Sequence, residues 1–324
     1  MARPPPRPYR FPAPVIQHPK HAATADCTSS PRAVLSSRDR HNTMPAISII
    51  IRAHNDAAYL PQVLAGLRRQ TRKDFELIAC DDRSNDCSAD LLRSWPGVVM
   101  LPPEQNGYVP GKVLNRAVRA AHGDIVVFNN ADAVIQDDRW LEELVAPLAD
   151  EHVAAVYARQ LPRPDAWPMV LRDHEQAFGD SPQGPAWRHF FSLASAAVRR
   201  DLLLATPFSE TLQYSEDVDW TWRLRKQGWL IRYAPNACVE HSHNYPPPAL
   251  VKRFYNEGLA DAAIFGDQSQ PLRACLQAAA DCARDLKYCI TNRFWAGILM
   301  AAPYRWRQKL AHDRGLRNYR PKQQ

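Results

Sequence analysis

The chain has 324 residues, of which 45% are hydrophobic, enough for one large folded core or one core with an appendage. Its formal net charge of +7 is concentrated at one end, because residues 1–44 carry seven basic and two acidic residues. The remaining sequence is nearly neutral, so the charge does not indicate nucleic-acid binding and we expect no nucleic-acid partner.

The first 44 residues differ in composition from the rest. They contain eight prolines, no glycine and no sustained apolar periodicity, so we predict a disordered Pro/Arg-rich leader that buries too little surface to offset its ordering entropy. Two other interpretations stay open: a targeting peptide, or an extension upstream of a start at Met44. A chain that begins at Met44 is expected to fold and to bind nucleotide as well as the whole chain does.

The cysteines and the apolar runs indicate in which cellular compartment the protein works. Seven cysteines, an odd number without a C-x-x-C pair, argue against a disulfide framework and a zinc site, and they favour the cytoplasm. The apolar stretch at 294–303 is about half the ~20 residues that span a bilayer, so no transmembrane helix is expected. Basic residues follow it, which leaves open either peripheral membrane contact through the C-terminal helices or an ordinary packed helix.

Strands and helices alternate along the first half of the chain. Ile47–Ile51 and Phe75–Cys80 are apolar runs that predict strands, and a helix between them is predicted to begin with the caps Asn55 and Asp56. Further expected elements are a strand over 98–101, a helix over 113–121 closed by Gly123, and a strand over 125–128. This alternation predicts an α/β fold whose ligands sit at the carboxyl ends of parallel strands.

The second half is less regular. The pattern predicts a helix over 140–148, a strand over 153–157, a Pro-rich loop over 161–168, an apolar run over 190–198, a helix over 216–228, and strands over 231–233 and 237–240. From Pro246 onward the pattern is helical, which predicts a C-terminal helical extension.

Polar clusters follow the predicted strands, at 52–55, 81–84, 129–132 and 241–243, and a further acidic pair lies at 216–217. Singly, each is also typical of a turn or a cap. Together they resemble family 2 glycosyltransferases of the GT-A fold, and most of all the rhamnosyltransferase-like branch. The resemblance covers about residues 46–255 and is carried by SIIIRAHNDAAYLPQVLAGL, DFELIACDDRSND, NRAVRAAHGDIVVFNNADAV, EDVDWTWRLRKQGW and HSHNY.

The resemblance implies a fold and an activity. It implies a mixed, mainly parallel sheet flanked by helices. With the helical pattern after Pro246, we expect a catalytic domain over 45–245 and a helical extension over 246–324. It implies an inverting, metal-dependent transfer of a sugar, rhamnose in this branch, from a dTDP- or UDP-sugar donor. The acceptor would be a glycan or a polyprenyl-linked glycan in surface polysaccharide synthesis, and the reaction would take place in the cytoplasm or at the inner face of the membrane.

The resemblance also assigns roles to residues. Nucleotide-binding positions are Ala53, Asn55, Asp81, Asp82, Gly111, Asn115 and Asn130. Asp132 matches the last acid of a D-x-D element that binds Mg²⁺ or Mn²⁺, and His241 or His243 would add a ligand. Asn130 replaces the first acid of that element, and Arg52 stands where many relatives have proline.

Asp217 matches the general base that takes the proton of the acceptor hydroxyl, with Glu216 beside it. Capping of a helix N-terminus is the alternative for this pair. Trp187 and Phe191 are expected to contact the acceptor. The competing hypothesis, motivated by Asn130, is a catalytically degenerate protein of the same fold that binds nucleotide or glycan without turnover.

Overall fold

The computed structural model describes residues 46–105, 107–179 and 189–321. In these residues eight strands form one mixed sheet in the order β3-β2-β1-β4-β7-β6-β8-β5, with β7 and β5 antiparallel to their neighbours. The strands are β1 (Ile47–Ala53), β2 (Phe75–Asp81), β3 (Val99–Leu101), β4 (Ile125–Asn129), β5 (Val134–Ile135), β6 (Val153–Leu161), β7 (Ser195–Arg199) and β8 (Leu230–Glu240). The predicted α/β sheet is confirmed.

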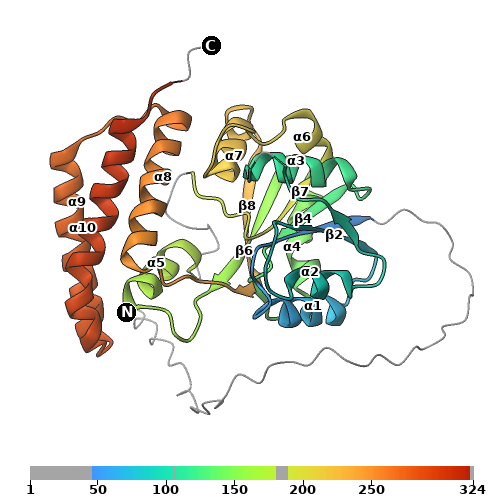
Figure 1. Ribbon diagram of the computed structural model, residues 1–324, viewed down its shortest axis with the longest axis horizontal. Helices are drawn as coiled ribbons and strands as arrows, with labels where there is room; N and C mark the ends of the chain where they lie inside the picture. The colour runs from blue at the N-terminus through green and yellow to red at the C-terminus, as the bar shows by residue number, and fades with distance from the viewer. Residues whose placement is uncertain (1–45, 106, 180–188, 322–324) are drawn as a thin grey trace, which may run out of the picture. The chain divides into compact units, whose positions relative to one another are not determined.

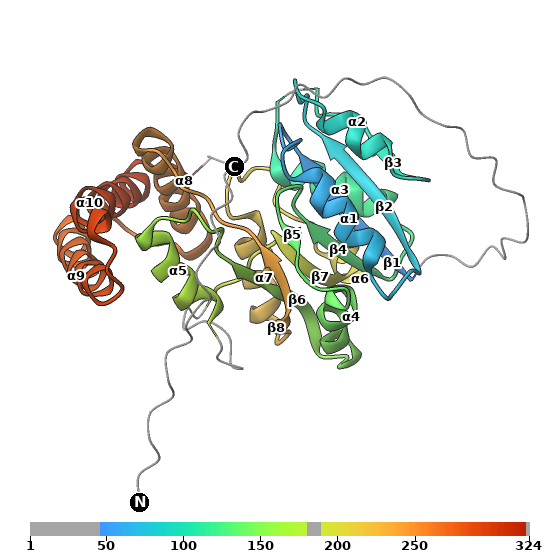
Figure 2. The same ribbon diagram turned by 90° about the horizontal axis from the view of Figure 1, so that it is seen from below.

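Helices cover both faces of this sheet (Figures 1 and 2). Alternate residues of β1 point to opposite faces, so Ile49 and Ile51 join one hydrophobic core and Ile50 the other. Helices α1 (Leu60–Arg69), α2 (Ser88–Arg93) and α4 (Trp140–Val145) pack on the Ile49 side, with the short 3-10 helix η1 (Ala146–Ala149) after α4. Helices α3 (Pro110–Ala120), α6 (Arg200–Ala205) and α7 (Glu216–Lys226) pack on the Ile50 side.

The C-terminal part is helical, as predicted. It consists of α8 (Pro247–Phe265), α9 (Pro271–Thr291) and α10 (Trp295–Asn318), which lie beside α5 (Pro168–Phe178) in Figure 1. Gly258 and Gly315 let α8 and α10 approach closely, since a Cβ on Gly258 would lie 2.1 Å from the His312 carbonyl oxygen. The buried Arg305 guanidinium of α10 donates to Asp285 of α9 and Asp173 of α5, so ion pairs join three helices.

Several predicted details are wrong for local reasons. Helix α1 begins at Leu60 rather than after Asn55 and Asp56, because Asn55 adopts a left-handed conformation (φ 60°) and the Asp56 carboxylate accepts the His54 N–H. Helix α3 ends at Ala120, before Gly123. Gly123 instead allows close approach, because a Cβ there would lie 2.6 Å from the Ile47 carbonyl carbon.

Other differences reflect weak or interrupted patterns. The two strands predicted between 231 and 240 are one strand, β8, whose pairing with β6 shifts register between Ala158 and Arg159. Helix α5 and the two-residue strand β5 were not predicted. In the described residues no helix is both long and apolar enough to cross a membrane.

Candidate active site

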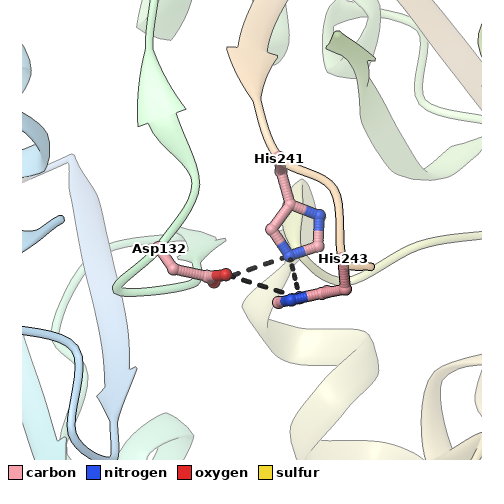
Figure 3. A group of neighbouring side chains, drawn as sticks. All are labelled: Asp132, His241 and His243. Carbon is pink, nitrogen blue, oxygen red and sulfur yellow. Dashed lines mark hydrogen bonds and ion pairs between the residues drawn. The ribbon is translucent and has the colours of Figure 1, made fainter. Parts of the chain in front are cut away.

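Asp132, His241 and His243 converge at one edge of the sheet, as Figure 3 shows. Asp132 lies in the turn between β4 and β5, and both histidines follow β8; the antiparallel pairing of Val134 with Glu240 brings the segments together. The His241 Nε2 and His243 Nε2 atoms lie 3.5 and 3.4 Å from the two Asp132 carboxylate oxygens. All three candidate ligand atoms fall within 4.8 Å of one another.

Neighbouring side chains orient His241. Its Nδ1 lies 2.8 Å from the Gln160 side-chain oxygen, while the Gln160 amide nitrogen donates to Ser192 Oγ at 2.7 Å. The Gln160 side-chain oxygen can only accept, so the His241 ring donates to it through Nδ1, and Nε2 is the ring atom that faces Asp132. The Nε2 atom of His174 lies 2.9 Å from the His241 carbonyl oxygen.

The Arg163 side chain fixes the position of Asp132 by hydrogen bonds. Its Nη2 donates to the Asp132 carbonyl at 2.7 Å and to the carboxylate at 3.2 Å, and its Nη1 donates to the Ser242 carbonyl. The guanidinium is buried and lies 4.0 Å from the Tyr59 ring centroid. One buried cation therefore ties the β4–β5 turn to the segment after β8.

The protonation states suit cation binding. Burial raises the pKa of the Asp132 carboxyl, but His241, His243 and Arg163 outweigh burial and hold that pKa well below its usual value. Burial, with His241 next, lowers the pKa of His243 to about 4, so this imidazole is neutral at pH 7. A carboxylate and imidazole lone pairs turned toward one point fit a divalent cation.

Glu216 and Asp217 begin helix α7, after Ser215 in a left-handed conformation (φ 59°). The Asp217 carboxylate accepts the Leu193 N–H at 3.0 Å and the Val218 N–H at 2.8 Å, which fixes its orientation. Burial and the adjacent Glu216 carboxylate raise the pKa of Asp217 to about 7. Glu216 instead pairs with Arg52 at 3.4 Å. Asp217 can therefore exchange a proton near neutral pH, while Glu216 is ion-paired.

Two adjoining cavities contain most of the predicted site residues. A cavity of about 320 Å³ is lined by Ala53, Asp81 and Asp82 at the carboxyl ends of β1 and β2. A larger one of about 960 Å³ is lined by residues that include Asn130, Phe191, Glu216, Asp217, His241 and His243. Arg52 and Tyr108, joined by a 3.0 Å hydrogen bond, line both cavities. Acids from distant segments, Asp81 and Asp82 on one side and Glu216 and Asp217 on the other, therefore line neighbouring cavities.

Parallel pairing builds the smaller cavity. Ala53 of β1 lies opposite Asp81 of β2, and the Asp82 N–H donates to the Ala53 carbonyl. The Asp81 carboxylate accepts the Ser84 N–H and hydroxyl, which holds it in place.

Three residues predicted to bind nucleotide are not among the described residues that line either cavity. Asn55 accepts the Asn85 N–H and thereby joins the loops after β1 and β2. Asn115 is buried and exchanges hydrogen bonds with the Phe208 backbone. Gly111 packs against the same segment, since a Cβ there would lie 2.0 Å from the Ser209 carbonyl oxygen. These three residues join neighbouring segments of the chain, and their contact with a nucleotide stays a prediction.

The structure describes only one of the two residues predicted to contact the acceptor. Phe191 lines the larger cavity, although its side chain is largely buried against Tyr157. Trp187 lies outside the described residues. Sequence reasoning missed Gln160, Arg163 and Tyr108. A buried Arg after a strand is a weak signal, and nothing in the local pattern marks Gln160.

Comparison with known proteins agrees with this geometry. Residues 48–205 match the family model "Glycosyl transferase family 2". The chain is 28% identical over 232 residues to the O-antigen chain rhamnosyltransferase WbaN of Salmonella anatum, which covers 68% of this chain and 73% of the relative. It is also 28% identical over 229 residues to RfbN of Salmonella typhimurium, another O-antigen chain rhamnosyltransferase, covering 67% of this chain and 72% of the relative.

Solved structures share the fold. The mannosyltransferase PcManGT from Pyrobaculum calidifontis, in complex with GDP-Man and Mn²⁺, superposes with a TM-score of 0.60 at 20% identity, covering 85% of this chain and 86% of that chain. Glucosyl-3-phosphoglycerate synthase from Mycobacterium tuberculosis, in complex with Mn²⁺, UDP and glucosyl-3-phosphoglycerate, superposes with a TM-score of 0.51 at 22% identity, covering 68% of this chain and 80% of that chain. Residues 48–205 of the chain therefore match glycosyl transferase family 2, and the protein is a glycosyltransferase of the GT-A fold, similar to the O-antigen rhamnosyltransferases.

Proposed function

We propose that this glycosyltransferase is an inverting, cation-dependent enzyme of surface polysaccharide synthesis that takes rhamnose from dTDP-rhamnose. Its acceptor is a glycan or a polyprenyl-linked glycan. The observation that carries the proposal is the meeting of the two cavities at Arg52 and Tyr108, with Asp81 on one side and Asp217 on the other. The choice of rhamnose rests on the similarity to WbaN and RfbN.

The smaller cavity binds the nucleotide. Carboxylates accept hydrogen bonds from base N–H and ribose hydroxyl groups, and Asp81 and Asp82 line this cavity beside Ala53. Arg116 and Glu104, which form an ion pair at 2.9 Å, also line it.

Asp132, His241 and His243 hold the cation. Mg²⁺ prefers oxygen ligands, so two imidazoles favour Mn²⁺ over Mg²⁺, and Mn²⁺ is the ion in the similar mannosyltransferase structure. When bound, a divalent cation supplies Lewis-acid neutralisation of the diphosphate charge. The residues of this chain contribute the ligand atoms and, through Gln160 and Arg163, their orientation.

Asp217 is the general base. Its carboxylate takes the proton of the acceptor hydroxyl while that oxygen bonds to the anomeric carbon, and the bond from this carbon to the diphosphate breaks with its electron pair on the diphosphate. One displacement without a covalent intermediate inverts the anomeric centre. A base with a pKa near 7 is matched to neutral pH, which suits this role.

The chain's organisation is also a proposal. We assign the catalytic domain to residues 45–245 and the helical extension to 246–324, with residues 1–44 outside both. The reaction is assigned to the cytoplasm, where nucleotide sugars are the donors. Five described cysteines are free thiols, which suits that compartment: Cys80, Cys87, Cys275, Cys282 and Cys289.

A donor screen tests the proposal. Purified protein is incubated with dTDP-rhamnose, UDP-glucose, UDP-N-acetylglucosamine and GDP-mannose, with Mn²⁺ or with EDTA, and released nucleoside diphosphate is measured. We expect release that is fastest with dTDP-rhamnose and requires Mn²⁺. Because water is the acceptor in this assay, NMR of the released sugar, recorded before mutarotation, should show the inverted anomer. Mn²⁺-dependent nucleotide stabilisation without release from any donor would favour the degenerate binding protein that Asn130 suggests.

A further inference from the structure

Helices α9 and α10 each carry an exposed apolar stripe. On α9 the stripe contains Leu272, Leu276 and Ile290, and on α10 it contains Trp295, Leu299 and Trp306; we call these six residues the outer face. The side chains of Leu272 and Leu299 are 75% and 82% exposed. Large apolar side chains at this exposure on two neighbouring helices are unusual for a surface that faces only water.

Helical periodicity places the outer face opposite the packed sides of the same helices. Alanines at 274 and 278 on α9, and Gly297 and Ala301 on α10, are buried against the rest of the fold. The two helices contact each other and are joined by residues 292–294, so they run antiparallel, and Figure 2 shows them at the edge of the helical extension, farthest from the sheet. In the described residues nothing covers the outer face.

The surroundings of the outer face are positively charged. Residues 271–321 contain ten basic and three acidic residues. The three acids are paired, Asp281 with Arg284, Asp285 with Arg305, and Asp313 with Arg317. Exposed basic side chains that add to the net charge are Lys287, Arg293, Arg307, Arg314 and Arg320.

This charge discriminates between occupants. A second copy of the chain docked on the outer face would bring two positively charged surfaces together, which is unfavourable at short range. The basic segment 1–44 has the same sign of charge. An anionic phospholipid surface is complementary to both features, because its headgroups attract Arg and Lys while its acyl chains accept Leu and Trp side chains.

The same helices also face the catalytic cavity. Ala274 and Gln277 of α9, with Tyr304 and Gln308 of α10, line the larger cavity on the side away from the outer face. One helical pair therefore separates the cavity that contains Asp217 from the outer face.

We propose that the outer face of α9 and α10 binds an anionic phospholipid bilayer as a peripheral contact, in the plane of the headgroups. The binding itself follows from the exposed side chains and the charge. Its purpose, to bring the larger cavity to a lipid-linked acceptor, rests on the proposed function.

Vesicle co-sedimentation of the full chain tests the proposal. Vesicles of phosphatidylcholine alone are compared with vesicles that contain about 30% phosphatidylglycerol. We expect binding to the anionic vesicles that weakens with added salt, and a drop of at least about tenfold in the partition coefficient for the variant Leu272→Ser/Leu276→Ser/Leu299→Ser. Leu204→Ser, an exposed leucine on α6 of the catalytic domain, is the matched control and should bind as the native chain does.

Three outcomes would overturn the proposal: no binding of the native chain to anionic vesicles, equal binding by the triple variant, or a dimer in light scattering that the triple variant dissociates without any vesicle binding. Nucleotide-sugar hydrolysis measured without vesicles should be unchanged in the triple variant. Because that assay tests the proposed function and sedimentation tests the outer face, a failure of either is recognised separately.

Discussion

The cavity proposed to bind the nucleotide and the Asp132–His241–His243 cluster both lie beside strands of the same sheet, but they are built in different ways. In the first, Ala53 and Asp81 end adjacent parallel strands, so strand pairing alone brings them together. In the second, the short antiparallel pair of β5 and β8 joins segments far apart in the chain, and Gln160 and Arg163 hold the side chains in position. The comparison teaches that one half of the site depends on backbone topology and the other on a buried polar network.

A substitution has different consequences in the smaller cavity and in the buried network. Loss of an acid in the nucleotide cavity removes its own contacts, and solvent can replace part of them. Loss of a member of the buried network leaves its partners unpaired; removing one partner of a buried ion pair such as Arg163–Asp132 typically costs about 3–5 kcal/mol. Residues that never touch the donor should therefore matter most around the cluster.

The largest effect on the turnover rate is expected from Asp217→Asn. Asp217 belongs to neither the smaller cavity nor the buried network, so this substitution tests whether the region between them is catalytic. An amide does not accept the hydroxyl proton, so the turnover rate should fall by about 10²–10⁴-fold while nucleotide affinity is kept. Initial rates of transfer and calorimetric titration of dTDP measure the two quantities. Asp219→Asn, in the same helix turn and paired with Arg223, is the control. An unchanged rate in Asp217→Asn would remove it as the base.

Gln160→Leu probes the buried network. We expect Mn²⁺ affinity to fall by about 10–100-fold, because the His241 ring loses the partner that fixes its proton on Nδ1. Calorimetric titration with Mn²⁺ in the presence of dTDP measures this. The matched change Gln136→Leu, at an exposed position whose amide donates to the Val134 carbonyl, should leave the affinity unchanged. Equal Mn²⁺ affinities in both variants would mean that backbone position alone is enough to orient the Asp132–His241–His243 cluster.

Asp82→Asn probes the nucleotide cavity. Loss of a charged hydrogen bond should weaken dTDP binding by about tenfold and leave the Mn²⁺ affinity of the free protein unchanged. The control is Asp90→Asn on α2, an exposed acid paired with Arg93 much as Asp82 is paired with Arg83. A matching loss of Mn²⁺ affinity would show that the two halves are coupled and would break the comparison.

The smallest effect is a pH dependence at Asp217. Transfer should increase as pH rises through about 7, since the base must be ionised. The raised folded pKa also means that the folded state holds a proton that the unfolded chain releases near pH 3.8, so this group contributes stability at low pH and loses it as pH rises toward 7. The melting temperature of Asp217→Asn relative to the native chain should therefore be higher at pH 8 than at pH 5. An equal difference at both values would contradict the raised pKa.

Much of the site was predictable because its residues follow strands. The apolar runs Ile47–Ile51 and Phe75–Cys80 predict buried strands, and the polar residues after them must then meet at one sheet edge. Asn55 and Asn115 were predicted as nucleotide contacts from their place in the motif, but their side chains bind backbone of neighbouring segments. A motif specifies the segment near a ligand and does not specify which way each side chain turns.

The sequence by itself determined the α/β core, the helical C-terminal part and the set of acids and histidines from which a site could form, because periodicity and residue chemistry are local properties. Only the tertiary structure decided that Asp132 meets both histidines, that Gln160 and Arg163 orient them, and that the apolar residues of α9 and α10 face outward. These features depend on strand register and helix packing between distant segments, and no local pattern encodes a pairing partner.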